Sequence, residues 1–213
     1  MVLNAGKSIH LVAGMFRVDL QKKTRAPDFI GAWQIDQPLL CEELISYFEA
    51  HQNKHKVGIT SAGENIAAKD RVDINVTPSD ITKASNTSLK NYIDALHRCY
   101  RDYMLQWPFL ATMSKELQIG EFNLGRYGVG QHFQKLHTER SSLNTLHRVL
   151  AWMTYLNDVQ DGGETYFEHY DITIKPSKGL TLIWPAEWTH AHRGNILLDG
   201  NKYMVTGWMN FQK

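Results

Sequence analysis

His137-Thr138-Glu139 places an imidazole and a carboxylate two residues apart. In a β-strand, side chains two residues apart point to the same side, so both groups could bind one metal ion. A second histidine from a distant strand would complete a set of two histidines and one carboxylate. Such a set leaves coordination positions open and suits non-heme Fe(II), which must bind a co-substrate and O2. Taken alone, a His-x-Glu motif is weak evidence for a metal site.

Two later histidines, His190 and His192, are candidates for the third ligand. Lys202 follows ten residues after His192 and opens an apolar segment that ends at Trp208. An ammonium group buried in such a segment needs an anionic partner, because an unpaired charge in a protein core is costly. A dicarboxylic acid held in the interior would provide that partner.

The elements that must position these groups change in character near residue 120. Before it, residues 38–49 and 88–104 have the apolar spacing of amphipathic helices. After it, turn residues separate short strand-like segments at 122–127, 148–156, 165–168, 172–174, 180–184 and 202–208. Helices followed by many short strands predict an α+β chain, mainly β, whose β part is a sandwich or jelly roll.

Composition narrows the class of protein. The 213 residues suit one domain with a substantial core, and 43% hydrophobic with 21% charged residues is typical of a globular protein. The net charge of +1 does not favour a nucleic-acid partner. The longest mainly apolar stretches, 9–16 and 179–185, are too short to span a membrane, and no secretory pattern is evident. Two cysteines cannot form a disulfide framework, so we expect a reducing, cytoplasmic location.

A series of short motifs runs from residue 122 to residue 211 in a fixed order: Tyr127-Gly128-Val129-Gly130-Gln131, His137-Thr138-Glu139, Arg148-Val149-Leu150, Tyr155-Leu156-Asn157-Asp158, Gly162-Gly163-Glu164-Thr165, Pro176-Ser177-Lys178-Gly179, His192-Arg193-Gly194 and Gly200-Asn201-Lys202. Each motif is weak, but together they resemble the 2-oxoglutarate- and Fe(II)-dependent oxygenases of the prolyl 4-hydroxylase type. The resemblance implies a double-stranded β-helix, a distorted, cupin-like jelly roll with N-terminal helices packed on the outside. We therefore expect a single oxygenase domain over residues 1–213. In it, 1–120 is a helical and loop support region and 121–213 is the β-helix core with the metal site.

Carried over residue by residue, the resemblance implies that His137, Glu139 and His192 bind the iron and carry the catalysis. His192 is preferred over His190 because of its spacing from Gly200-Asn201-Lys202. The family usually has His-x-Asp, and this chain departs from it with a glutamate, which is one methylene longer. Some halogenases of the superfamily replace the carboxylate with a small residue to admit chloride, and Glu139 argues against that chemistry.

The resemblance also implies a co-substrate site. Lys202 would pair with the C5 carboxylate of 2-oxoglutarate, and Tyr155 would support that carboxylate. Tyr127 would lie near the iron and the other end of the co-substrate. Thr206 shares the face of Lys202 by strand alternation and is the fourth expected co-substrate residue.

The implied reaction hydroxylates an unactivated C–H bond, most closely that of peptidyl proline, with succinate and CO2 as co-products. Its cofactors are Fe(II), 2-oxoglutarate and O2, with ascorbate as a candidate reductant, and its partner is a peptide or protein substrate. The same chemistry on a free amino acid, another protein side chain or a nucleobase stays open. So do a jelly-roll binding module without catalysis and a zinc site at His190-Ala191-His192.

Residues on the substrate side are harder to assign from sequence. Trp188 is our candidate for contact with a proline-bearing peptide. Arg193 is either a surface residue or a group at the pocket mouth that holds an acidic substrate. The segment 61–77 has little apolar periodicity, and either a lid that closes over substrate or a solvated connection fits it.

Overall fold

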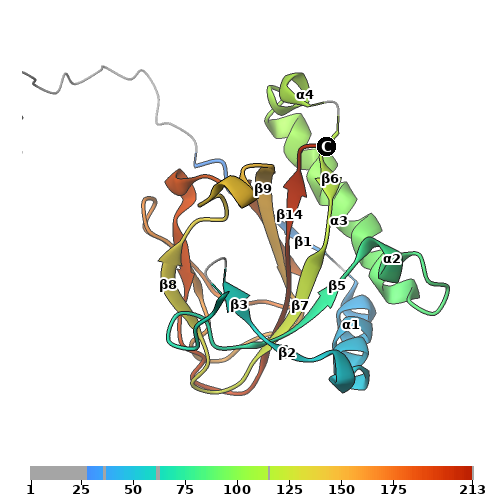
Figure 1. The fold of residues 1–213 in the computed structure, drawn as a ribbon, viewed down its shortest axis with the longest axis vertical. Helices are drawn as coiled ribbons and strands as arrows, with labels where there is room; N and C mark the ends of the chain where they lie inside the picture. Colours follow the sequence, from blue (N-terminus) through green and yellow to red (C-terminus); the bar gives the residue numbers. More distant parts are fainter. Residues whose placement is uncertain (1–27, 36, 61–62, 115, 213) are drawn as a thin grey trace, which may run out of the picture.

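Two antiparallel sheets face each other, and helices cover the outer side of the larger one (Figure 1). The computed structural model describes residues 28–35, 37–60, 63–114 and 116–212. No helix in these ranges is long and apolar enough to cross a membrane.

The large sheet has eight strands within the described ranges. From one edge to the other they are β1 (Gly31–Gln34), β12 (Leu180–Pro185), β9 (Arg148–Tyr155), β14 (Lys202–Asn210), β7 (Phe122–Tyr127), β5 (Val72–Val76) and β2 (Lys56–Val57), with β6 (Gln118–Ile119) paired to the end of β14. The small sheet runs in the order β11 (Ile172–Ile174), β10 (Thr165–Phe167), β13 (His192–Gly194) and β8 (Phe133–His137). A short hairpin joins β3 (Ile59–Thr60) to β4 (Gly63–Glu64).

The helices pack on the large sheet through one apolar face. They are α1 (Pro38–Ala50), α2 (Pro78–Ile81), α3 (Thr87–Gln106) and α4 (Leu110–Met113), with 3₁₀ turns at Gln52–Lys54, Leu143–Thr145 and Trp188–His190. Leu89, Tyr92 and Leu96 recur at helical spacing on α3 and are almost fully buried against the sheet. The Tyr92 hydroxyl donates to Thr154 on β9 at 2.8 Å, so the buried phenol keeps a hydrogen-bond partner.

Two apolar clusters follow from this layering. One lies between the helices and the outer face of the large sheet, and the other fills the space between the two sheets. The second cluster includes Met153, Phe167, Trp184 and Met204, which come from strands of both sheets. This second cluster surrounds the polar side chains of the candidate site with apolar groups.

The prediction of a distorted jelly roll, with two facing antiparallel sheets and helices on the outside, is confirmed. The predicted helices correspond to α1 and α3, and the six predicted strands correspond to β7, β9, β10, β11, β12 and β14. The pattern of apolar residues did not indicate β8 and β13, because these strands are short and largely polar.

The region before residue 120 contributes more than supporting helices and loops. Strand β1 pairs with β12, and β5 pairs with β7, so both extend the large sheet. Residues 61–62 of the segment 61–77 lie outside the described residues. For the second half of this segment, which includes β5, the prediction of a lid or a solvated connection is wrong. Ile74 and Val76 of β5 are buried under the helices. The alternating charged residues of the same segment are also buried, and their side chains lie on the opposite face of the large sheet: Lys69, Arg71 and Asp73. A strand with one apolar face and one buried charged face shows little of the periodicity that marks an ordinary strand.

Candidate metal and co-substrate site

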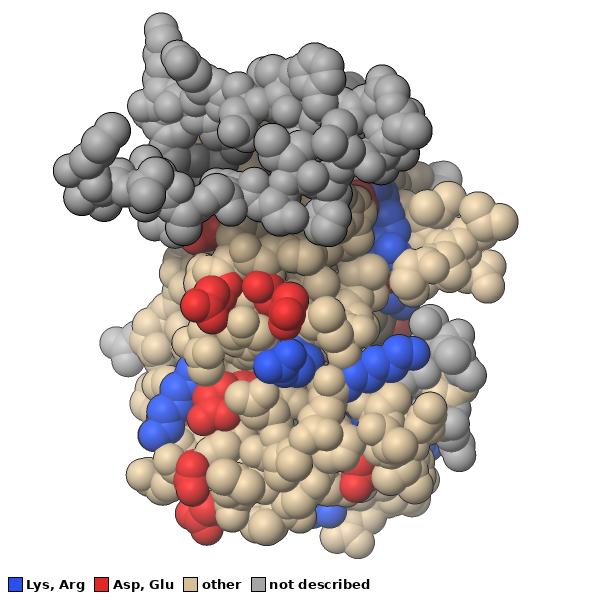
Figure 2. Space-filling model, turned by 90° about the vertical axis from the view of Figure 1, so that its left-hand side faces the viewer, with Lys and Arg blue, Asp and Glu red and all other residues tan. Residues whose placement is uncertain are grey.

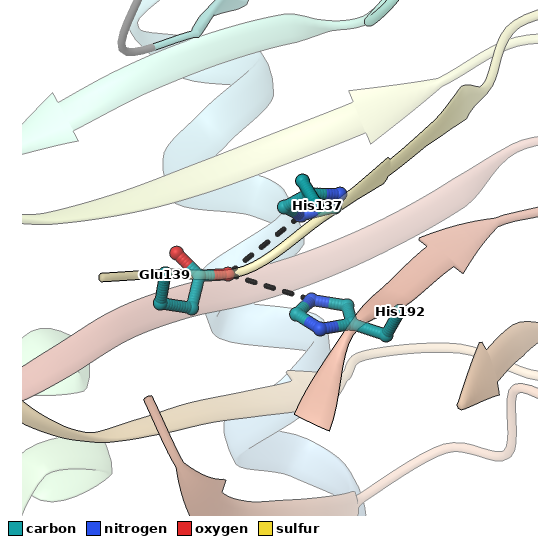
Figure 3. A group of neighbouring side chains, drawn as sticks. All are labelled: His137, Glu139 and His192. Atoms are coloured by element: carbon teal, nitrogen blue, oxygen red, sulfur yellow. Dashed lines mark ion pairs between the residues drawn. The ribbon is translucent and has the colours of Figure 1, made fainter. Parts of the chain in front are cut away.

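Three side chains from β8, the residues after it and β13 converge at one end of the space between the sheets (Figure 3). His137 and His192 are direct neighbours in the antiparallel pair β8–β13, which places their rings 4.4 Å apart. Glu139 Oε1 lies 3.4 Å from His192 Nε2 and 3.8 Å from His137 Nε2. One ligand atom from each residue lies within 4.8 Å of the others, as binding of a single ion requires.

Both imidazoles are oriented by backbone carbonyls. His137 Nδ1 lies 2.8 Å from the Lys135 carbonyl, and His192 Nδ1 lies 2.9 Å from that of His190. A proton on each Nδ1 leaves each Nε2 lone pair free toward Glu139, which is the tautomer a metal ligand needs. Burial, with a further contribution from His192, lowers the pKa of His137 to about 3 and keeps this ring neutral.

Glu139 is held by groups from the large sheet. Strand β8 ends at His137, so strand alternation alone does not aim this carboxylate. The Trp208 indole N–H donates to Glu139 Oε2 at 2.6 Å, and the Arg148 guanidinium donates to the Glu139 carbonyl at 2.9 Å and stacks over the Trp208 ring at 3.6 Å. Burial alone would raise the pKa of Glu139, but the two histidines and the indole lower it well below its usual range. The carboxylate is therefore ionised, and its Oε1 faces the histidines.

These donors fit a divalent first-row metal. Two imidazole nitrogens and one carboxylate oxygen point to one place, and His137 and Glu139 are in the protonation states that bind metal. His190 does not join them. Its Nε2 lies 2.7 Å from the Asp28 carbonyl and its Nδ1 lies 3.0 Å from the Thr189 hydroxyl, so both ring nitrogens are engaged elsewhere.

Lys202 lies deeper between the sheets and is only 2% exposed. Its ammonium donates to the Gly163 carbonyl at 2.8 Å and lies 4.2 Å from the centre of the Tyr127 ring. Within the described residues it makes no ion pair. Burial, and then the charge of Arg71, lower the pKa of Lys202 to about 7. The Tyr155 hydroxyl is nearby in the same interior and donates to Thr165 at 2.6 Å.

Sequence analysis missed a second buried cation, Arg71. Its guanidinium donates to the Tyr127 hydroxyl at 3.3 Å and to the Thr206 hydroxyl at 3.2 Å. It also forms an ion pair with Asp73 at 2.6 Å, and Lys69 pairs with the same carboxylate at 3.1 Å. The alternation Lys69-x-Arg71-x-Asp73, which leads into β5, was the signal that could have indicated a buried charged face.

The two candidates for the substrate side lie outside this interior. Trp188 is 68% exposed and makes an edge-on contact with His169. Arg193 follows His192 on β13 and points to the outer face of the small sheet, where it pairs with Glu168 at 3.3 Å and covers the Tyr166 ring at 4.6 Å. On the side of the molecule that carries β8, acidic and basic residues are interspersed, with no large field of one sign (Figure 2).

Comparison with known proteins agrees with this geometry. Residues 122–210 match the family described as the 2OG-Fe(II) oxygenase superfamily. The chain is 27% identical to human prolyl 4-hydroxylase subunit alpha-1 over 113 residues, which cover 46% of this chain and 20% of that subunit. It is 24% identical to prolyl 4-hydroxylase 2 of Arabidopsis thaliana over 205 residues, which cover 81% of this chain and 63% of the plant protein. The chain thus spans about a fifth of the first relative and less than two thirds of the second.

Solved structures show the same fold at low sequence identity. A viral collagen prolyl hydroxylase from Paramecium Bursaria Chlorella virus-1, solved with 2OG, has a TM-score of 0.63 and 16% identity over 87% of this chain and 97% of its own. A Pseudomonas putida prolyl-4-hydroxylase has a TM-score of 0.66 and 15% identity over 87% and 94%. The resemblance to oxygenases of the prolyl 4-hydroxylase type is confirmed: the β core of this chain, residues 122–210, matches the 2OG-Fe(II) oxygenase superfamily, and the solved prolyl hydroxylases share its fold.

Proposed function

We propose that this chain is an Fe(II)- and 2-oxoglutarate-dependent dioxygenase that hydroxylates proline residues in a peptide or protein. One observation carries the proposal: an open group of two histidines and a carboxylate shares one interior with Lys202, an ammonium that has no ion pair among the described residues. A binding module would have no evident need for both features. A metal ion and a dianionic co-substrate account for both.

The residues of the chain have separate tasks in this reaction. His137, His192 and Glu139 would hold the metal, and Lys202 would bind the far carboxylate of 2-oxoglutarate, supported by Tyr155. A bound Fe(II) supplies the activation of O2 and the oxidation that converts 2-oxoglutarate to succinate and CO2 and hydroxylates the substrate. Metal ligands and co-substrate anchor come from both sheets, so the fold fixes the distance between them before either molecule binds.

Aromatic side chains keep water away from the ligands. Phe133 stacks on the His137 ring with centres 3.8 Å apart, and Phe167 and Trp184 flank His192 at 5.4 and 5.2 Å. Their bulk leaves the open side of the metal group as the route for substrate. A dry site strengthens the interactions of charged groups within it.

Peptidyl proline is the substrate we favour because the curated relatives named above are prolyl 4-hydroxylases. A further structural neighbour, with a TM-score of 0.65 and 11% identity, is a prolyl hydroxylase in complex with a hypoxia inducible factor peptide fragment from Trichoplax adhaerens. The exposed Trp188 offers an aromatic surface to a proline-bearing segment. Ascorbate as reductant and a reducing, cytoplasmic location complete the proposal, the latter in keeping with two buried free cysteines.

Succinate release from 2-oxoglutarate tests the proposal. The purified chain is incubated with Fe(II), 2-oxoglutarate and a panel of proline-containing peptides, each paired with a peptide in which alanine replaces proline. We expect succinate release that depends on Fe(II) and on proline, with a mass gain of one oxygen on the peptide, and no turnover by His192→Ala. Release without dependence on proline would contradict the substrate assignment. No release or 2-oxoglutarate binding under any condition would contradict the dioxygenase assignment.

A further inference from the structure

Arg71 crosses the interior between the co-substrate anchor and the metal group. Its side chain is 4% exposed, and its two terminal nitrogens reach different strands, Tyr127 on β7 and Thr206 on β14. Tyr127 is the direct partner of Lys202 in the β7–β14 register. Thr206 lies two residues before Trp208 on the same face of β14, and Trp208 contacts the carboxylate of the metal group. The guanidinium therefore borders both ends of the space in which a co-substrate would lie.

The backbone makes room for this arginine. Gly125 on β7 is the register partner of Asp73 on β5 and of Met204 on β14. A Cβ atom at Gly125 would lie 2.6 Å from Asp73 Oδ1 and 3.2 Å from Arg71 Cζ. The missing side chain at Gly125 thus leaves room for Arg71, which directly precedes β5, to extend across β7 to β14. The ion pair with Asp73 then fixes the guanidinium in place.

The hydrogen bonds of Arg71 determine which hydrogens of Tyr127 and Thr206 remain available. A guanidinium can only donate, so the oxygens of Tyr127 and Thr206 must accept from Arg71. Each hydroxyl keeps one hydrogen to donate, and within the described residues neither of them donates to a protein acceptor. The Tyr155 hydroxyl differs, because it already donates to Thr165. The buried Tyr127 hydroxyl and the partly buried Thr206 hydroxyl thus each have a hydrogen left for an acceptor in the interior, and a carboxylate is the strongest acceptor of this kind.

We propose that Arg71 is a positioning residue for the co-substrate: it holds the hydroxyl groups of Tyr127 and Thr206 so that both donate to a carboxylate of 2-oxoglutarate. This inference rests on the proposed function. It gives Arg71 a role different from that of Lys202, which pairs with a carboxylate directly. The rival reading is that Arg71 only stabilises the fold through its ion pair with Asp73.

Calorimetry in the absence of O2 measures the affinity of the full, Mn(II)-loaded chain for 2-oxoglutarate. This affinity distinguishes a positioning role of Arg71 from a purely structural one. Arg71→Lys keeps the charge beside Asp73 but replaces the two terminal nitrogens that reach Tyr127 and Thr206 separately with the single nitrogen of a shorter side chain. We expect it to weaken 2-oxoglutarate binding about 10- to 100-fold, because hydrogen bonds to a charged acceptor are lost, while Mn(II) affinity stays unchanged. Arg126→Lys is the matched control: this arginine also lies beside β5, on β7, but pairs with Glu49 on the helix side.

A double-mutant cycle provides the readout that a structural role would not change. If Arg71 acts through Tyr127, the effects of Arg71→Lys and Tyr127→Phe on 2-oxoglutarate affinity should be strongly non-additive. Additive effects would overturn the inference, and so would unchanged affinity in Arg71→Lys. Should Arg71→Lys fail to fold, Tyr127→Phe and Thr206→Val remain informative, because each must weaken binding if the inference holds and unchanged affinity in both overturns it. Failure of the unaltered chain to bind 2-oxoglutarate at all would instead overturn the proposed function.

Discussion

Replacing Lys202 with methionine should stabilise the ligand-free chain while removing its affinity for 2-oxoglutarate. Burial lowers the pKa of this lysine from 10.5 to about 7 in the folded chain. Between these two values the unfolded chain binds more protons than the folded one, so the contribution of Lys202 to stability rises with pH in this window. The shift costs the fold about 4 kcal/mol at pH 7.5 and about 1.5 kcal/mol at pH 9.5.

Methionine fills a similar volume without the charge, so the stability of Lys202→Met relative to the unaltered chain should fall by about 2.5 kcal/mol between pH 7.5 and pH 9.5. The variant also loses the hydrogen bond to Gly163, which lowers its stability by about 1–3 kcal/mol at both pH values. This loss therefore cancels when the two pH values are compared. Urea unfolding of both proteins at the two pH values measures this difference, with Lys178→Met, at a half-buried lysine that pairs with Glu42, as the control.

The same variant should bind 2-oxoglutarate about 10²–10³-fold more weakly, because one partner of a buried charged pair is missing. Calorimetry with Mn(II) measures this affinity, and metal binding itself should be nearly unchanged. A variant destabilised equally at both pH values would refute the reasoning, since it would mean that folding leaves the pKa of Lys202 unchanged. Unchanged 2-oxoglutarate affinity would remove Lys202 from the site.

Three other substitutions test individual contacts. Trp208→Phe keeps an aromatic ring under the neighbouring guanidinium but removes the indole N–H that donates to the carboxylate of the metal group; Mn(II) affinity should fall about 10- to 100-fold, and an unchanged affinity would show that this contact does not orient the ligand. His190→Ala should leave Mn(II) affinity intact whereas His192→Ala abolishes it, and the reverse result would exchange their roles. Gly125→Ala should lower unfolding free energy by about 1–3 kcal/mol in urea titrations, because the added methyl group collides with the buried ion pair.

The fold and the candidate metal group could be predicted from sequence because their signals are local. Apolar periodicity located α1 and α3 to within two residues, and turn residues separated most strands of the two sheets. His137 and Glu139 could be recognised as candidate metal ligands from their residue types and spacing, although the short, polar strand β8 could not be predicted. The choice of His192 over His190 depended on motif spacing, and the structure places His192 in the group.

Arg71 could not be predicted in the same way, because its role depends on a contact between segments far apart in the chain. Its partners Tyr127 and Thr206 lie 56 and 135 residues away in sequence. A charged segment without apolar periodicity usually lies in solvent, which is why 61–77 suggested a lid. Here the charges face the interior between the sheets, and only the β5–β7 pairing reveals it.

The charges around the site suit a metal and a dicarboxylate together better than either alone. Positive charge comes from Lys69, Arg71, Arg148 and Lys202, and negative charge comes from Asp73 and Glu139. These six side chains leave an excess of about two positive charges when both lysines are protonated. A divalent cation alone would add to this excess in a low-dielectric interior. A dianion alone would balance this excess but would place a carboxylate near that of Glu139 with no metal between them. A divalent cation and a dianion bound together add no net charge, and each neutralises the other in the interior. Coupling of this kind is reciprocal, so the metal must strengthen 2-oxoglutarate binding by the same factor by which 2-oxoglutarate strengthens metal binding.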